Sequence, residues 1–356
     1  MKKTAVVIAP GRGTYNQSEL GYLGQNHADK TKLIAQFDDF RRANGQKTVS
    51  ELDGAARFSG ATHTRGDNAS PLIYACAYSD FMSINREEIE VVAVTGNSMG
   101  WYIALACAGA LSSSNGLEVV NTMGTLMQDT LVGGQLIYPF VDDEWEIDRE
   151  RHTLILEKIH QIDARPETVL KISINLGGMI VLAGNETGLS AFEAQMPRLQ
   201  GRFPMRLPNH AGFHSSMQSL VAAKGREALS RDLFAQPEIP LVDGRGAIWY
   251  PPVTNLDALY DYTLGHQVTE MYDYTRAIAV SAREFMPDIF IVLGPGTTLG
   301  GATAQSLLLS GWHGLDSKVD FKERQKTSPI LISMGDDDQR KQLCLTSAPM
   351  SPNSVI

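Results

Sequence analysis

Ser98 lies at the centre of a Gly-x-Ser-x-Gly motif, Gly96-Asn97-Ser98-Met99-Gly100, which is the clearest sign of chemistry in the sequence. The unbroken apolar run over 89–94 predicts a buried strand before the motif, and residues 101–111 have the spacing of a helix after it. A serine on such a turn is held exposed, and the first N–H groups of the helix can stabilise an oxyanion. A plain glycine-rich turn remains an alternative, so the chemistry also requires a base elsewhere in the chain.

Histidine is the usual base for a serine nucleophile, and the chain contains eight. His210, His214 and His266 lie near glycine or proline at the ends of predicted elements, where functional groups concentrate. His214 is the best candidate, because it stands at a predicted helix start within Gly212-Phe213-His214-Ser215-Ser216-Met217. The other five are expected to be ordinary surface histidines: His27, His63, His152, His160 and His313.

Composition excludes several other classes of function. The chain has 31 basic and 40 acidic residues, a net charge of −9 and no basic cluster, so nucleic acid is not expected as a partner. Three widely spaced cysteines indicate a reducing, cytoplasmic environment, and no group of residues has the spacing of a metal site. No long apolar run predicts a membrane span, and residues 4–9 are interpreted as a first strand rather than a signal peptide.

The order of predicted elements indicates an α/β fold. The strand over 4–9 ends at a Pro-Gly loop, and residues 69–81 are predicted to form a buried helix with Ser70 as its cap and Pro71 in its first turn. Residues 132–207 alternate as β-α-β-β-α-β, the pattern of a ferredoxin-like unit.

These patterns predict two domains and a tail. Residues 1–131 and 208–335 are expected to form one discontinuous α/β-hydrolase-like catalytic domain with a parallel sheet. Residues 132–207 are expected to be a ferredoxin-like subdomain inserted into it. Residues 336–356, which are charged and then rich in serine and proline, are expected to form a loosely ordered C-terminal tail.

Four segments, in order, resemble the malonyl-CoA:acyl carrier protein transacylases and the acyltransferase domains of polyketide synthases. Thr95–Leu111 is similar to the family's nucleophile segment, Gly-His-Ser-x-Gly-Glu-Tyr followed by a helix that ends Ala-Gly-x-Leu. Residues 213–217 are similar to its catalytic-histidine segment, and 293–299 to its Gly-Pro-Gly-x-x-Leu. Pro-Gly-Arg-Gly at 10–13 stands where the family has Pro-Gly-Gln-Gly, and the resemblance covers roughly residues 4–310.

The resemblance implies a ping-pong acyl transfer. Ser98 would attack the thioester of an acyl-CoA with His214 as base, and the ester would pass to the phosphopantetheine thiol of an acyl carrier protein. A backbone carbonyl orients the histidine in this family, a role that falls here to Gln267. Backbone N–H groups of Met99 and Arg12 would form the oxyanion hole. The resemblance implies acyl-CoA as a substrate and no permanently bound cofactor.

One departure from the family pattern bears on the acyl group. In the family stretch Met-Arg-Gly-x-x-Met-Gln, an arginine binds the malonyl carboxylate, and Met123 occupies that position here. A thioether offers nothing to an anion, so the substitution predicts a neutral acyl group such as acetyl or something longer. Arg12 is either a solvated loop residue or a relocated cation that would accept a carboxylate.

Other changes surround the nucleophile. Asn97 stands for the family's histidine and Trp101 for its glutamate, and both are expected to contact substrate, although simple helix packing is the alternative for Trp101. Phe213 is also expected at the substrate. Asn175 resembles the family's asparagine before a Ser-Pro-Gly turn and is expected to shape the substrate cleft. Ser70 replaces a glutamine.

Two other functions remain open on the same scaffold. A thioester hydrolase would use water in place of the carrier thiol. A non-catalytic subunit of a larger synthase would explain the altered residues around the nucleophile, but it would not explain why Ser98, His214 and Gln267 are all present.

Overall fold

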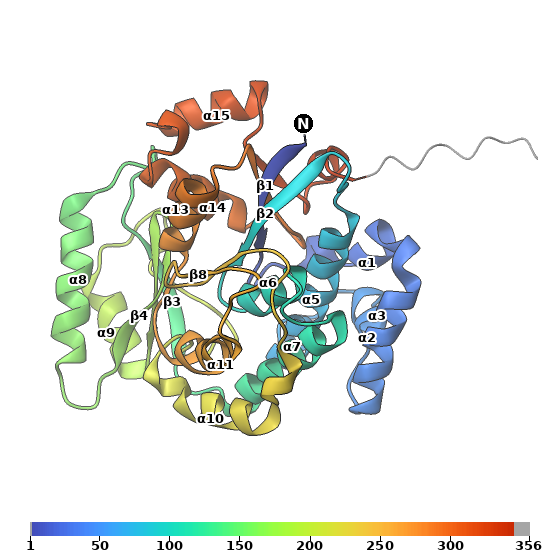
Figure 1. Ribbon diagram of the computed structural model, residues 1–356. Helices are drawn as coiled ribbons and strands as arrows, with labels where there is room; N and C mark the ends of the chain where they lie inside the picture. Colours follow the sequence, from blue (N-terminus) through green and yellow to red (C-terminus); the bar gives the residue numbers. More distant parts are fainter. Residues whose placement is uncertain (1, 345–356) are drawn as a thin grey trace, which may run out of the picture.

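The computed structural model describes residues 2–344, which form two β-sheets surrounded by helices (Figure 1). The expected α/β fold is confirmed. The larger sheet has the strand order β11-β10-β1-β2-β7-β8, and its strands are parallel except for β8, which runs antiparallel to β7. Their bounds are β1 Lys3–Ala9, β2 Ile89–Gly96, β7 Leu241–Val242, β8 Ile248–Trp249, β10 Ile289–Val292 and β11 Leu331–Ser333.

The smaller sheet has the strand order β6-β3-β5-β4-β9. Its strands are β3 Gly134–Pro139, β4 Leu170–Leu176, β5 Met179–Gly184, β6 Met205–Arg206 and β9 Tyr272–Asp273. The first four pair antiparallel, whereas β9, which comes from much later in the chain, pairs parallel to β4. Helices α8 (Arg149–Asp163) and α9 (Glu186–Gln195) lie side by side on one face of this sheet (Figure 1).

The remaining helices surround the larger sheet and the junction of the two sheets. They are α1 Tyr22–Asn26, α2 Thr31–Ala43, α3 Val49–Asp53, α4 Gly60–His63, α5 Gly66–Ser83, α6 Gly100–Cys107, α7 Ser113–Thr130, α10 Ser219–Ala228, α11 Leu256–Asp261, α12 Gln267–Thr269, α13 Tyr274–Phe285, α14 Leu299–Leu309, α15 Lys318–Thr327 and α16 Asp337–Arg340. Short 3-10 turns cover η1 Gln17–Glu19, η2 Ala28–Lys30, η3 Ser216–Gln218, η4 Arg231–Leu233 and η6 Trp312–Gly314, and η5 Tyr262–His266 is a π-helical turn. None of the helices within residues 2–344 is long and apolar enough to cross a membrane.

Helix α5 begins a turn earlier than the sequence predicts, so Ser70 is not its cap and Pro71 lies inside it. A proline within a helix leaves the carbonyl of the residue four positions earlier without its N–H donor. Here that carbonyl belongs to Asp67, and Nη1 of the buried Arg41 donates to it over 2.7 Å. The Gly66 N–H at the helix start donates to Gln128 Oε1. Contacts from distant segments therefore extend the helix through Pro71.

The first part of the expected tail, residues 336–344, belongs to the folded body rather than being loosely ordered. It contains α16, and Arg340 at the end of this helix lies 2.7 Å from Asp80, whose side chain is fully buried in α5. The same carboxylate accepts hydrogen bonds from Tyr22 and the Gly294 N–H. The rest of the expected tail, residues 345–356, lies outside the described residues.

Candidate active site

Ser98 occupies a sharp turn between β2 and α6. Its φ of 57° lies in the left-handed region, which is uncommon for a residue other than glycine. The flanking glycines permit the turn, because a Cβ on Gly100 would lie 2.3 Å from the Ala9 carbonyl oxygen, and one on Gly96 would lie 2.3 Å from the Gly100 backbone. Glycine is therefore sterically required at both positions of the motif. The strand–turn–helix arrangement is the one that its sequence predicts.

His214 lies next to the serine and has a fixed orientation. Its Nε2 is 2.7 Å from Ser98 Oγ, and its Nδ1 is 2.7 Å from the backbone carbonyl oxygen of Gln267. Because a carbonyl can only accept, Nδ1 carries the proton and Nε2 accepts the hydrogen bond of the Ser98 hydroxyl. Burial lowers the pKa of His214 to about 4, against the opposing effect of the Gln267 carbonyl. The imidazole is therefore neutral near pH 7 and able to take a proton.

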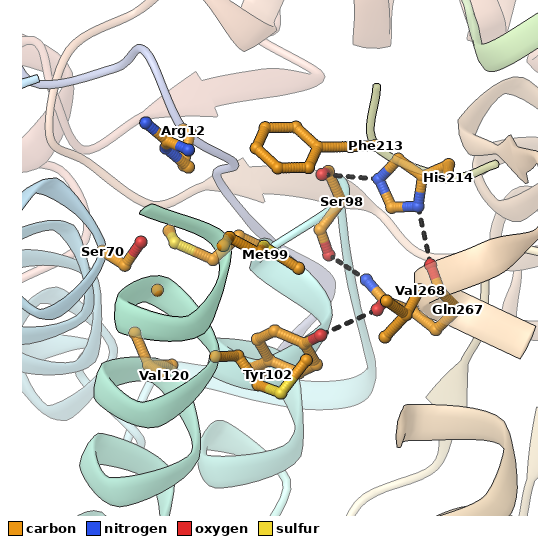
Figure 2. A pocket seen from close by; sticks show the side chains of 13 residues that line it. Arg12, Ser70, Ser98, Met99, Tyr102, Val120, Phe213, His214, Gln267 and Val268 are labelled. Carbon is orange, nitrogen blue, oxygen red and sulfur yellow. Dashed lines mark hydrogen bonds between the residues drawn. The ribbon is translucent and has the colours of Figure 1, made fainter. Parts of the chain in front are cut away.

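The side chain of Gln267 connects this pair to α6. Its Nε2 donates to the Ser98 carbonyl over 2.9 Å, and its Oε1 accepts from the Tyr102 hydroxyl over 2.9 Å. Figure 2 shows the resulting cycle, in which one residue contacts the serine through its side chain and the histidine through its backbone. Gln267 follows the π-helical turn η5 and is 2% exposed, so its orientation is set by packing.

Two backbone N–H groups beside Ser98 are available to a ligand. Met99 precedes the first turn of α6, and Arg12 lies in the loop after β1; neither N–H has an acceptor among residues 2–344. The loop packs tightly against the serine motif, since a Cβ on Gly11 would lie 2.7 Å from the Asn97 carbonyl oxygen. These are the two donors that the family resemblance assigns to an oxyanion hole.

One cavity opens from Ser98 toward α7, and we call it the inner pocket. It has an empty volume of about 390 Å³, which includes space open to solvent. Much of its wall is apolar. Figure 2 shows the contributions of Met99, Val120, Val268 and the rings of Tyr102 and Phe213, and Met123 and Met127 also line it. The other lining residues are Arg12, Ser70, Ser98, Gly124, His214 and Gln267. Met123, the residue that replaces the family's arginine, is therefore part of this wall.

A second and larger cavity, which we call the groove, runs from Ser98 between the two sheets. It has an empty volume of about 1590 Å³, which includes space open to solvent. One side comes from the loop after β1, and the other comes from the smaller sheet, including Ile137, Ile174 and Val181. Asn97 and His210 also line it. Ser98, Arg12 and Phe213 are the only described residues that line both cavities.

The Arg12 side chain lies where the two cavities meet and is engaged by the protein. Its Nη2 donates to the carbonyl oxygens of Thr64 and Asn209 over 3.0 and 3.1 Å. The guanidinium carbon lies 5.4 Å from the centre of the Phe213 ring, within the range of a cation–π contact. Burial lowers the pKa of Arg12 to about 10, and Asp67 partly offsets this effect. Arg12 is therefore still a cation at neutral pH.

The structure does not bring every expected substrate-binding residue to these cavities. Trp101 is 0% exposed, lines neither cavity, and donates from Nε1 to Thr263 Oγ1 over 3.0 Å. It packs edge-on against Tyr262, which is the helix-packing alternative. Asn175 donates to Asp273 over 3.1 Å, and its two neighbours in β4, rather than Asn175 itself, line the groove.

Two of the histidines expected on the surface are buried instead. They are His27 and His63, with exposed fractions of 0% and 2%. His27 hydrogen bonds to Asp80, and both ring nitrogens of His63 contact backbone groups, so tertiary contacts account for their burial. His210 lies in the groove, a position that its place at the end of a predicted element does not by itself indicate.

Comparison with known proteins identifies relatives of one kind. No family model matches the chain. The malonyl CoA-acyl carrier protein transacylase of Salmonella typhimurium is 24% identical over 213 residues, which is 59% of this chain and 64% of the relative. That of Bacillus subtilis is 22% identical over 234 residues, covering 66% of this chain and 70% of the relative. The chain thus spans slightly less than two thirds of the length of the Salmonella relative.

Solved structures share the fold of this protein over nearly the whole chain. The acyl-carrier-protein S-malonyltransferase from Burkholderia pseudomallei superimposes with a TM-score of 0.73 at 23% identity, covering 96% of this chain and 99% of that one. A malonyl-transacylase in complex with a type II polyketide synthase acyl carrier protein gives 0.70 at 16% identity, covering 96% and 98%. The resemblance that the sequence motifs carry is therefore confirmed: the chain is a homologue of the malonyl-CoA:acyl carrier protein transacylases and shares their two-sheet α/β fold.

Proposed function

We propose that this protein is an acyltransferase that carries an acyl group on Ser98, from an acyl-CoA to the phosphopantetheine thiol of an acyl carrier protein. The observation that carries the proposal is the relay from Ser98 Oγ through His214 to the Gln267 carbonyl, with both contacts at 2.7 Å. This relay lies at the junction of the inner pocket and the groove. An acyl group and a thiol-bearing arm can therefore approach the serine from different sides.

In the first half-reaction, Ser98 Oγ attacks the thioester carbonyl carbon while its proton passes to His214 Nε2. The negative charge that develops on the carbonyl oxygen is accepted by the N–H groups of Met99 and Arg12. Collapse of this intermediate breaks the carbon–sulfur bond, and the leaving thiolate takes the proton from His214. The Gln267 carbonyl stabilises the imidazolium that exists between the two proton transfers.

The second half-reaction reverses these steps with a new thiol. The carrier's thiol gives its proton to His214 and attacks the ester carbonyl, and Ser98 leaves with that proton. Neither half-reaction requires a redox partner or a permanently bound cofactor. If water took the place of the thiol, the same groups would release a free acid, so the hydrolase is the natural competing outcome.

We propose further that the acyl group is neutral. Met123 is 1% exposed and belongs to the apolar wall of the inner pocket, where a carboxylate would lose its hydration without gaining a partner. Arg12 is the one cation in the lining of the pocket within residues 2–344, and its Nη2 is engaged by two backbone carbonyls. A carboxylate would have to draw the guanidinium away from these acceptors.

The domain organisation supports the same assignment. We propose a discontinuous α/β-hydrolase-like catalytic domain, 1–131 and 208–335, with a ferredoxin-like subdomain over 132–207. The element order β3-α8-β4-β5-α9-β6 and the strand order β6-β3-β5-β4 support the subdomain. The groove lies between the parts, so the insertion would form one wall of the thiol entrance.

Intact-mass analysis of the protein after incubation with a panel of acyl-CoAs tests the proposal. One acyl adduct is expected, absent in Ser98→Ala and retained in the control Ser114→Ala, whose serine is exposed on α7. A holo carrier protein is then added. Transfer of the acyl group to its thiol supports the acyltransferase, whereas release of free acid supports the hydrolase. Absence of an adduct with every acyl-CoA would instead favour a non-catalytic subunit.

A further inference from the structure

His210 is a groove residue that the proposed mechanism does not use. It lies in the segment that leads to His214, and its ring is 5.7 Å from that of Phe213. The residue as a whole is only partly buried. An imidazole in the wall of a cavity that reaches Ser98 is positioned to contact whatever occupies that cavity.

A chain of hydrogen bonds fixes the tautomer of His210. The Phe213 carbonyl oxygen can only accept, so Ser173 Oγ, 2.8 Å away, must donate to it. Ser173 Oγ then accepts from Gln135 Nε2 over 2.6 Å, which orients the amide so that its Oε1 faces His210 Nδ1 at 2.9 Å. Because Oε1 also only accepts, His210 carries its proton on Nδ1, and Nε2 presents a lone pair.

The Nε2 atom is free to meet a ligand. It has no hydrogen-bond partner within residues 2–344. The unpartnered polar atoms that are fully buried do not include it, so Nε2 keeps some contact with solvent. Burial of the ring, with a smaller effect from Arg12, lowers the pKa of His210 to about 3. The group is therefore neutral at physiological pH, too weak a base to activate a thiol, and suited to accept a hydrogen bond.

We infer that His210 Nε2 accepts a hydrogen bond from an amide N–H of the pantetheine arm, in acyl-CoA and in the carrier protein alike. The inference rests on the proposed function and specifies how the same site recognises its thiol. The arm alternates methylene groups with secondary amides. The methylenes suit the apolar wall that includes Ile137, Ile174 and Val181, and the N–H requires an acceptor there.

Three butyryl thioesters separate this contact from general effects on catalysis. Butyryl-pantetheine contains both amides, butyryl-N-acetylcysteamine contains one, and S-pentyl thiobutyrate contains none. The measurement is kcat/KM for formation of the acyl-Ser98 adduct with each donor. In His210→Phe, which keeps a ring but removes the acceptor, the ratio of butyryl-pantetheine to S-pentyl thiobutyrate should fall about threefold to tenfold, the usual range for one neutral hydrogen bond. The donor at which the loss first appears identifies which amide makes the contact.

Further variants distinguish loss of the His210 contact from a general loss of folding. His210→Gln should recover much of the ratio, because its amide can donate to Gln135 and still accept from a ligand. Gln135→Met should give a smaller loss with the same dependence on donor, since His210 would no longer be held in one tautomer. His160→Phe, an exposed histidine replacement on α8, should leave all three rates unchanged.

Two results would overturn the inference. An unchanged ratio in His210→Phe and Gln135→Met would show that Nε2 makes no such contact, and an equal loss with all three donors would show a purely structural role. Failure of the proposed function is a different observation, because the unaltered protein would then form no adduct with any donor.

Discussion

The lining of the inner pocket predicts a preference for an uncharged acyl group over a charged one. Malonyl and isovaleryl groups have the same number of heavy atoms, and they differ only in that a carboxylate replaces an isopropyl group. A comparison of malonyl-CoA with isovaleryl-CoA therefore changes the charge at nearly constant shape. We expect isovaleryl-CoA to acylate Ser98 faster, because the wall around Met123 contributes apolar groups and no anion partner.

The expected size of the effect follows from the protonation of the carboxylate. A carboxyl group with an ordinary pKa of about 4 must gain a proton to enter the pocket as a neutral group, which at pH 7 costs about three pKa units, or ~4 kcal/mol. The preference for isovaleryl can therefore reach about a thousandfold in kcat/KM. The same reasoning predicts a distinct pH signature: malonyl labelling should rise about tenfold for each unit that the pH falls from 7 to 5, while isovaleryl labelling stays flat.

The assay is rapid quenching followed by intact-mass measurement of the acyl-Ser98 adduct, at several pH values. Equal or faster labelling by malonyl-CoA at pH 7 would refute the reasoning. Arg12→Gln then identifies the error, because this substitution retains the backbone N–H and removes the one cation in the described lining. If Arg12→Gln abolished malonyl labelling but not isovaleryl labelling, Arg12 would be the relocated carboxylate clamp.

Three further changes test the relay and the fold. Tyr102→Phe removes the hydroxyl that donates to Gln267 Oε1 and should lower kcat about twofold to tenfold with little change in KM, measured by steady-state acyl transfer. Acylation of Ser98 by isovaleryl-CoA should fall as the pH drops through about 4, because His214 becomes protonated there and cannot accept the serine proton; a pH–rate profile measures this. Asp80→Asn leaves the cation of Arg340 without its buried partner and should lower the free energy of unfolding by about 3–5 kcal/mol, measured by urea denaturation.

Each of these three expectations would be contradicted by a specific result. A raised KM with unchanged kcat in Tyr102→Phe would mean that this hydroxyl acts on substrate binding rather than on the orientation of Gln267. A midpoint near pH 6.5 in the rate profile would mean that His214 is far more solvated than its surroundings imply. Unchanged stability of Asp80→Asn would mean that Arg340 finds another acceptor. Asp337→Asn, an exposed substitution in α16, the helix that contains Arg340, serves as the control.

The sequence predicts well those features that depend on neighbouring residues. The order of strands and helices follows from periodicity, and the turn at Ser98 follows from two glycines whose steric role the structure makes explicit. His214 could be selected among eight histidines because it stands at the end of an element, close to glycine. The likeness to the transacylases joined these local features into one site.

Features that depend on distant residues could not be predicted in this way. Helix α6 is buried along its whole length, so its sequence gives no direction for Trp101, and the contact with Thr263 decides it. The early start of α5 depends on Arg41, and the burial of His27 depends on Asp80. Each of these is a contact between side chains or backbone groups that sequence periodicity does not record.

The two cavities suggest why recognition of the acyl group and of the thiol arm can be separated in this protein. Apart from Ser98, Arg12 and Phe213 are the only residues within 2–344 that contribute to both, and these two are in cation–π range of each other. A change at Met123 therefore alters the surroundings of the acyl group without touching the groove, and a change at His210 does the reverse. Because Met123 and His210 line different cavities, their effects on kcat/KM should add in a double variant. A departure from additivity would point to Arg12 and Phe213 as the elements that transmit it.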